Sequence, residues 1–162
     1  MIAPTLRLPT VSFGSVSAIV TSISLIIGFG AAGIPKTAIV AALLIIGLAD
    51  NLTDSLSIHI YQESEKLEER AAFKATISNF LTRLLISMSF VFFVLAFSRA
   101  IAVFASLALG IALLTGLTWF VARSRGANVT TEVLKHLAVA TVIIAASRAI
   151  GIFISMMPVT TG

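Results

Sequence analysis

The chain has 162 residues, of which 58% are hydrophobic and only 11% are charged, and its mean hydropathy is +1.08. Soluble domains carry about 25% charged residues, so this composition excludes a soluble enzyme, a disordered tail and a nucleic-acid-binding module. The net charge of +4 does not indicate nucleic acid either, because the 11 Lys and Arg residues are scattered between apolar blocks. The composition predicts an integral membrane protein in a lipid bilayer.

Five apolar stretches are long enough to cross a hydrocarbon core of ~30 Å, which takes about 20 helical residues. They cover residues 13–33, 37–60, 76–97, 100–122 and 133–157. We therefore predict one all-α transmembrane domain of five helices over residues 1–162. A signal peptide is the alternative for the first stretch, but only Arg7 precedes it as a basic residue, and the apolar run is long.

The segments between the stretches carry turn and capping residues. Gly33 and Pro35 indicate that one helix ends and the next begins there. Thr130, Thr131 and Glu132 offer N-cap chemistry before the last stretch. Residues 61–70 contain no helix breaker, so the second helix is expected to continue through them beyond the membrane.

The basic residues sort by side of the membrane. Seven of them fall on one side, and two fall on the other: Arg7, Lys66, Arg70, Lys74, Arg123, Arg125 and Lys135 against Lys36 and Arg99. The positive-inside rule then places the N-terminus in the cytoplasm and the C-terminus outside. In a prokaryote this multi-pass protein would lie in the cell membrane.

Polar residues concentrate in the second stretch. Asp50 and Asp54 are four residues apart and share one helical face, and an ionisable group inside a membrane is costly enough to suggest a function. We predict that Asp50 and Asp54 bind a metal ion, with Glu63 and Glu65 gathering cations at the cytoplasmic mouth. The predicted transport pathway also includes Asn51, Thr53, Ser57, His59 and Arg83.

Arg83 supports a second interpretation. In an antiparallel third helix it should lie level with about residues 55–58, within reach of Asp54. An Asp54–Arg83 ion pair could be purely structural, in a non-transporting membrane subunit or scaffold. If Arg83 contacted both aspartates, a metal site there would lose most of its negative charge.

The first stretch carries a stripe of small residues at three- and four-residue steps: Gly14, Ser17, Thr21, Ser24 and Gly28. Such stripes let two helices in lipid approach closely. The stripe indicates either a homodimer packed through this face or packing within one chain.

The sequence contains no recognisable catalytic motif. It has no Gly-rich phosphate loop, no HExxH and no Ser/His/Asp set. Two aspartates on one helix are also a poor protease dyad. We expect no enzymatic activity and no resident cofactor, and the absence of cysteine excludes thiolate metal sites and disulfides.

Residues 42–65, with Gly47-Leu48-Ala49-Asp50 at their centre, resemble the second helix of the vacuolar iron transporter family. The last stretch is similar to that family's fifth helix around Ser147-Arg148-Ala149-Ile150-Gly151. The resemblance implies a homodimeric exporter of Fe²⁺ or Mn²⁺ that exchanges the ion for protons, with Asp50 as the pathway carboxylate.

The sequence also departs from that family's pattern. Ile58 stands where the family has a methionine, and Gln62 stands where it has a glutamate. The first stretch has no Asp-Gly step, and the cytosolic metal-binding insert is absent.

Overall fold

The computed structural model describes residues 8–64 and 69–157. They form five α-helices: α1 Leu8–Ala31, α2 Lys36–Ser64, α3 Glu69–Ala96, α4 Arg99–Ser124 and α5 Val129–Ser155. All five are long and apolar enough to cross a membrane. The prediction of an all-α chain with five such helices is confirmed, with ends that differ from the predicted ones by a few residues.

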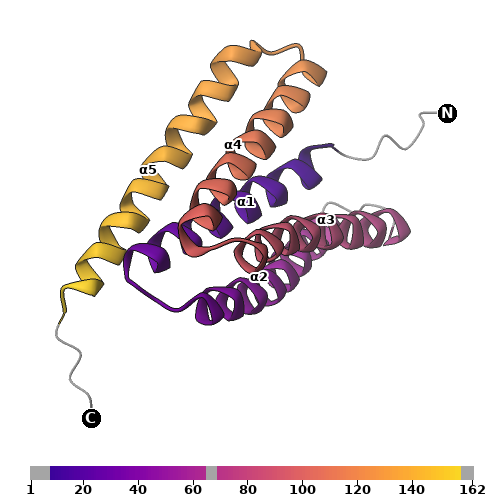
Figure 1. Ribbon diagram of the computed structural model, residues 1–162. Coiled ribbons are helices and arrows are strands. Elements are labelled where there is room, and N and C mark those ends of the chain that lie inside the picture. Colours follow the sequence, from indigo (N-terminus) through magenta and orange to yellow (C-terminus); the bar gives the residue numbers. More distant parts are fainter. Residues whose placement is uncertain (1–7, 65–68, 158–162) are drawn as a thin grey trace.

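The helices are arranged as two antiparallel hairpins with α1 between them (Figure 1). The α2–α3 hairpin and the α4–α5 hairpin diverge, and α1 packs against all four of the other helices. Its buried face carries Ile19, Ile23 and Ile26, which meet Phe90 of α3 and Leu114 of α4 in one apolar cluster. Helix α1 is therefore the centre of the fold.

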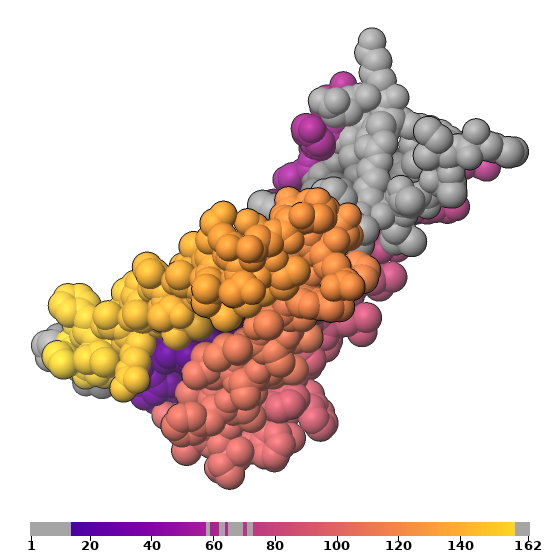
Figure 2. Space-filling model, turned by 90° about the horizontal axis from the view of Figure 1, so that it is seen from above, coloured from indigo at the N-terminus to yellow at the C-terminus, as the bar shows by residue number. Residues whose placement is uncertain are grey.

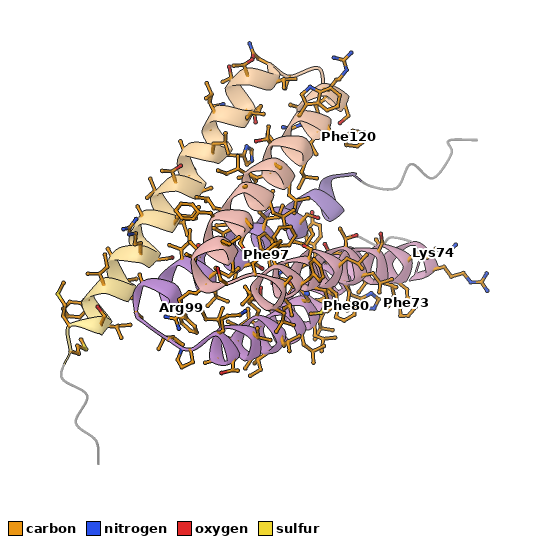
Figure 3. All side chains as sticks on the ribbon, in the orientation of Figure 1. Phe73, Lys74, Phe80, Phe97, Arg99 and Phe120 are labelled. Carbon is orange, nitrogen blue, oxygen red and sulfur yellow. The ribbon has the colours of Figure 1, made fainter. Side chains whose placement is uncertain are left out.

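The outer surfaces of the hairpins are apolar rather than charged. Large side chains such as Phe73 of α3 and Phe120 of α4 are exposed and project away from the bundle (Figure 3). Leu85 and Phe104 are more than two-thirds exposed. A soluble protein would not expose so much apolar surface, whereas lipid contact favours it.

The turn between α1 and α2 follows the predicted chemistry. Gly33 has a φ of 76° and ends α1, and the Ile34 N–H donates to the Phe29 carbonyl at 3.0 Å. This left-handed backbone suits glycine. Pro35 then directly precedes α2, so the prediction of a Gly stop and a Pro start is confirmed.

The same turn is tied to the turn between α3 and α4. Lys36 donates to the carbonyl oxygen of Phe97 at 2.8 Å, and Arg99 donates to the carbonyl oxygen of Ile34 at 2.8 Å. Figure 3 shows Arg99 beside the α1–α2 turn. Lys36 and Arg99 thus satisfy carbonyl groups at the turns that connect these helices.

Two predicted helix boundaries need correction. The N-cap of α5 is Asn128, whose side chain accepts from the Thr131 N–H at 3.1 Å, so Thr130 to Glu132 lie inside the helix. Glu69 and Arg70 begin α3 instead of continuing α2, because the chain must reverse for α3 to pack against α2. Residues 65–68 of the predicted extension lie outside the described residues.

The two ends of the small-residue stripe of α1 pack against other helices of the chain, and its middle lines a groove. Gly14 is buried against α3 and Gly28 against α5, while Ser17, Thr21 and Ser24 line a groove between α1, α4 and α5. At Gly151 of α5, an added Cβ would overlap the carbonyl oxygen of Gly28 and lie 3.0 Å from the Ala31 Cβ. Glycine therefore sets the α1–α5 distance.

Replacing Gly151 by alanine should destabilise the protein, because its neighbour is backbone that cannot rotate away. We expect a loss of about 1–3 kcal/mol from overpacking, measured by unfolding in detergent. Gly116→Ala is the matched control, since a Cβ there meets nothing within 4 Å. Equal stability of the two variants would contradict the close α1–α5 approach.

Candidate functional site

Arg83 lies in the middle of α3 and is completely buried. Its guanidinium makes three hydrogen bonds to α2. Nε donates to Asn51 Oδ1 at 2.7 Å, Nη2 donates to Asp50 Oδ2 at 2.8 Å, and Nη1 donates to Asp54 Oδ2. We call Asp50, Asn51, Asp54 and Arg83 the arginine cluster.

The arginine cluster belongs to a polar strip along the α2–α3 contact. One turn towards the start of α2, Gly47 packs closely against Ser87 of α3. A Cβ added to Gly47 would lie 3.1 Å from the Ser87 Cβ. One turn towards the end of α2, Asn79 of α3 donates a hydrogen bond to Ser55 Oγ at 3.5 Å. The strip repeats every four residues on both antiparallel helices. It therefore follows one face of each helix, and this fixes how α2 and α3 are aligned.

Helix α1 closes the inner side of the arginine cluster. A Cβ at Gly14 would lie 2.9 Å from Arg83 Cδ and would overlap Asn79 Oδ1. The cavity beside Asp50, Asn51 and Ser87 measures only ≈ 10 Å³, about the size of one water. The described residues therefore leave no passage for a cation between α1, α2 and α3 at this point.

The outer side of the arginine cluster is open. The side chains of Asp50 and Asp54 are 43% and 34% exposed, and Arg83 bonds only the Oδ2 atom of each. Thr53 and Ser57 are exposed on the same helix, and their hydroxyls donate to the carbonyls of Ala49 and Thr53, both at 2.9 Å. Oxygen atoms thus gather on an uncovered part of α2.

The structure brings together some of the predicted site residues. The expected Asp54–Arg83 contact is present. Arg83 also reaches Asp50 and Asn51, about one turn from the predicted level at residues 55–58. Ser55, Asn79 and Gly14 join the strip without having been predicted as site residues. The four-residue spacing of Asn79 and Arg83 was the available signal for Asn79.

Other predicted residues stand apart or cannot be placed. His59 lies five residues beyond Asp54, about 7 Å along the helix axis. The side chain of Glu63 and all of Glu65 lie outside the described residues. Within the part of the chain that the structure describes, no three His, Asp or Glu side chains are grouped to hold a metal ion.

The electrostatics of the arginine cluster follow from its composition. Arg83 contacts both aspartates, which is the condition under which the sequence predicts a weakened metal site. Its guanidinium offsets one of the two carboxylate charges and leaves a net charge of −1 instead of −2. A buried arginine is strongly destabilising without partners, so the carboxylates have a structural task whatever else they do. The remaining charge and the two Oδ1 atoms are what the arginine cluster can offer a cation.

Comparisons with family models, with curated proteins and with solved structures give no match to this chain. The relationship to vacuolar iron transporters therefore stays a prediction from the sequence.

Removing the guanidinium should leave two uncompensated carboxylates at the α2–α3 contact. We expect Arg83→Gln to lower the free energy of unfolding in detergent by about 3 kcal/mol, the low end for a broken buried pair because the carboxylates are partly exposed. Adding Asp50→Asn and Asp54→Asn to this variant should restore part of the loss. Arg123→Gln, at an exposed position, is the control. Wild-type stability of Arg83→Gln would contradict this role of Arg83.

Proposed function

We propose that this protein transports a divalent metal ion, Fe²⁺ or Mn²⁺, out of the cytoplasm, with Asp50 and Asp54 as the ion-binding groups. One observation carries the proposal. These carboxylates are 43% and 34% exposed, yet they lie within an apolar helix long enough to span a membrane. Hydrocarbon is a costly environment for a carboxylate. In a bilayer, water or another protein surface must therefore cover this face of α2, so that the carboxylates do not contact hydrocarbon.

Arg83 sets the strength of such a site. It occupies one oxygen of each carboxylate and leaves the Oδ1 atoms to an incoming ion. With a net charge of −1, the arginine cluster would hold a divalent cation loosely, and a transport site must also release its ion. Carboxylate oxygens suit Mn²⁺ and Fe²⁺. Protonation of either carboxylate would weaken ion binding further, which is the basis for proton exchange.

The proposed homodimer would cover the exposed face of α2. The small-residue stripe of α1 packs against α3 at Gly14 and against α5 at Gly28, whereas Ser17, Thr21 and Ser24 between them line the groove beside α4 and α5. Leu52, Thr53, Leu56 and Ser57 are exposed on α2 beside the arginine cluster. A second copy placed there would enclose two pairs of aspartates in one polar passage.

The three hydrogen bonds of Arg83 favour a second candidate function. A fully buried guanidinium with three partners on α2 is what a structural lock between two helices requires. In this case the protein is a non-transporting membrane subunit or scaffold. The exposed face of α2 would then contact a partner subunit.

Ion flux in proteoliposomes separates the two candidates. We expect Mn²⁺ flux in the wild type and a fall to the level of empty vesicles in Asp50→Asn and in Asp54→Asn, because each removes a negative ligand. Glu132→Gln is the control, since Glu132 lies at the start of α5.

Unchanged flux in Asp50→Asn would reject the site. Absence of flux for every divalent ion in the folded wild type would favour the scaffold.

The proposed dimer face is open to cysteine cross-linking, because the chain has no cysteine of its own. Single cysteines at Leu52, Thr53 and Leu56 should give disulfide-linked dimers in membranes, strongest at the position nearest the symmetry axis. Val142 on α5 is also exposed, and Val142→Cys should stay monomeric. Cross-linking at Val142 with none on α2 would contradict this arrangement.

A further inference from the structure

A long groove lies between α1, α4 and α5, on a different part of the molecule from the arginine cluster. Its volume is ≈ 1250 Å³, more than the roughly 300–1,000 Å³ of pockets for small molecules. It follows α1 from Val16 to Phe29, about 20 Å along the helix axis. Figure 2 shows α1 at the bottom of the hollow between α4 and α5.

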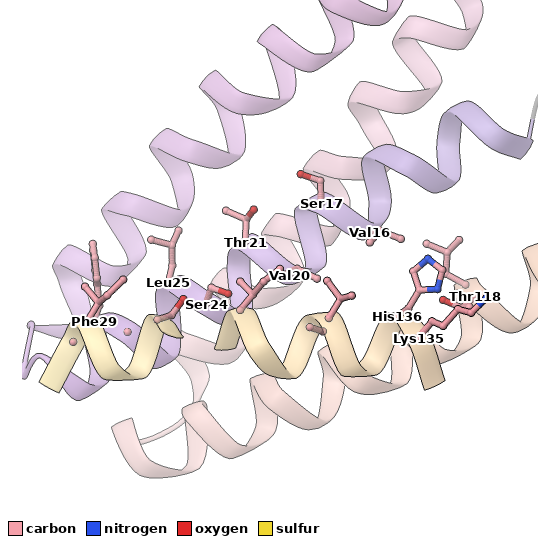
Figure 4. A pocket seen from close by; sticks show the side chains of 18 of the residues that line it. Val16, Ser17, Val20, Thr21, Ser24, Leu25, Phe29, Thr118, Lys135 and His136 are labelled. Atoms are coloured by element: carbon pink, nitrogen blue, oxygen red, sulfur yellow. The ribbon is translucent and has the colours of Figure 1, made fainter. Parts of the chain in front are cut away.

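The two ends of the groove differ in chemistry. Leu25 and Phe29 of α1 line the apolar end, whereas Lys135 and His136 of α5 gather near Thr118 at the other (Figure 4). Arg125, from the α4–α5 turn, also lines the polar end. The groove is therefore amphipathic, with its basic residues at one end.

The basic end of the groove has N–H donors that no described residue uses and that can bind an anion. Glu132 forms ion pairs with Lys135 at 3.1 Å and with Arg125 at 3.7 Å. It offsets one of the two positive charges. The Lys135 ammonium has three N–H donors and the Arg125 guanidinium has five, so most of them remain available. His136 donates from Nδ1 to the Glu132 carbonyl at 2.8 Å, which fixes its ring.

Two residues that line the groove carry buried hydroxyls without a hydrogen-bond partner among the described residues. Thr118 is 6% exposed, and its Oγ1 has no hydrogen-bond partner among the described residues. The same holds for Oγ of Ser24, on the facing helix α1. Both residues line the groove. Thr141 of α5 satisfies its hydroxyl on the backbone at 2.8 Å, whereas Ser106 of α4, which does not line the groove, also has no partner among the described residues.

We propose that this groove binds an acidic phospholipid. The phosphate lies at Arg125, Lys135 and His136, the ester region lies beside Thr118, and an acyl chain follows α1 towards Phe29. Basic pockets between transmembrane helices select lipids with anionic headgroups in this way. The apolar lining takes up the acyl chain as it would in the bilayer. This site is independent of ion transport through the arginine cluster.

Native mass spectrometry of the detergent-solubilised protein tests the site, with palmitoyl-oleoyl phosphatidylglycerol titrated against phosphatidylcholine of the same chains. We expect tighter binding of phosphatidylglycerol. Arg125→Gln and Lys135→Gln should each weaken it about fivefold, the effect of one basic residue near an anionic lipid. Arg123→Gln, outside the groove, should not.

The acyl part of the site has its own matched pair of variants. Val139 lines the groove and Val142 does not, although both are exposed on α5. Val139→Trp should remove the bound lipid, and Val142→Trp should leave it.

Equal binding of the two lipids would overturn the proposal, and so would equal behaviour of the two tryptophan variants. A protein dimer that Val139→Trp abolishes would show that a second copy occupies the groove instead.

Discussion

A guanidinium in the middle of a helix long and apolar enough to span a membrane is the constraint on which the rest of this structure depends. Arg83 is completely buried, and a charge in that position is stable only with partners. Its three acceptors all lie on α2, within five residues of one another. The need to satisfy Arg83 therefore fixes the alignment of α2 with α3, and the polar strip continues that alignment by one turn on each side.

Close approach of α1 completes this arrangement. Lipid provides no hydrophobic force between helices, so packing depends on how near the backbones come. Glycine allows this at both ends of α1, where Gly14 meets Asn79 and Arg83, and Gly28 meets Gly151. One helix thus seals the inner side of the arginine cluster and also forms the floor of the groove beside α4 and α5. Both candidate sites depend on the position of α1.

The sequence predicted the five helices well, because a membrane span is a long apolar run and needs no tertiary information. It also predicted the Asp54–Arg83 contact. Unpaired charges in apolar helices are costly, so opposite charges on neighbouring antiparallel helices are expected to pair. Contact of Arg83 with both aspartates was considered only as a condition and its bond to Asn51 was not predicted, because a shift of one turn between two helices is invisible in either one alone. The role of the α1 stripe stayed open for a related reason. Small residues indicate close packing but do not identify the partner helix. The groove was unpredictable because its lining comes from three helices.

Two interpretations of the arginine cluster differ in what the carboxylates do beyond binding Arg83. For a transporter, the half-exposed oxygens of Asp50 and Asp54 are ion ligands. For a scaffold, they are only partners of the arginine. Both share the central claim that one guanidinium bridges both carboxylates inside the bilayer.

Solid-state nuclear magnetic resonance tests this claim directly, on protein in bilayers with isotope-labelled arginine and aspartate. The account predicts correlation signals from the Arg83 guanidinium nitrogens to the carboxyl carbons of both Asp50 and Asp54. A signal to only one of these carboxyl carbons, or to neither, would contradict it.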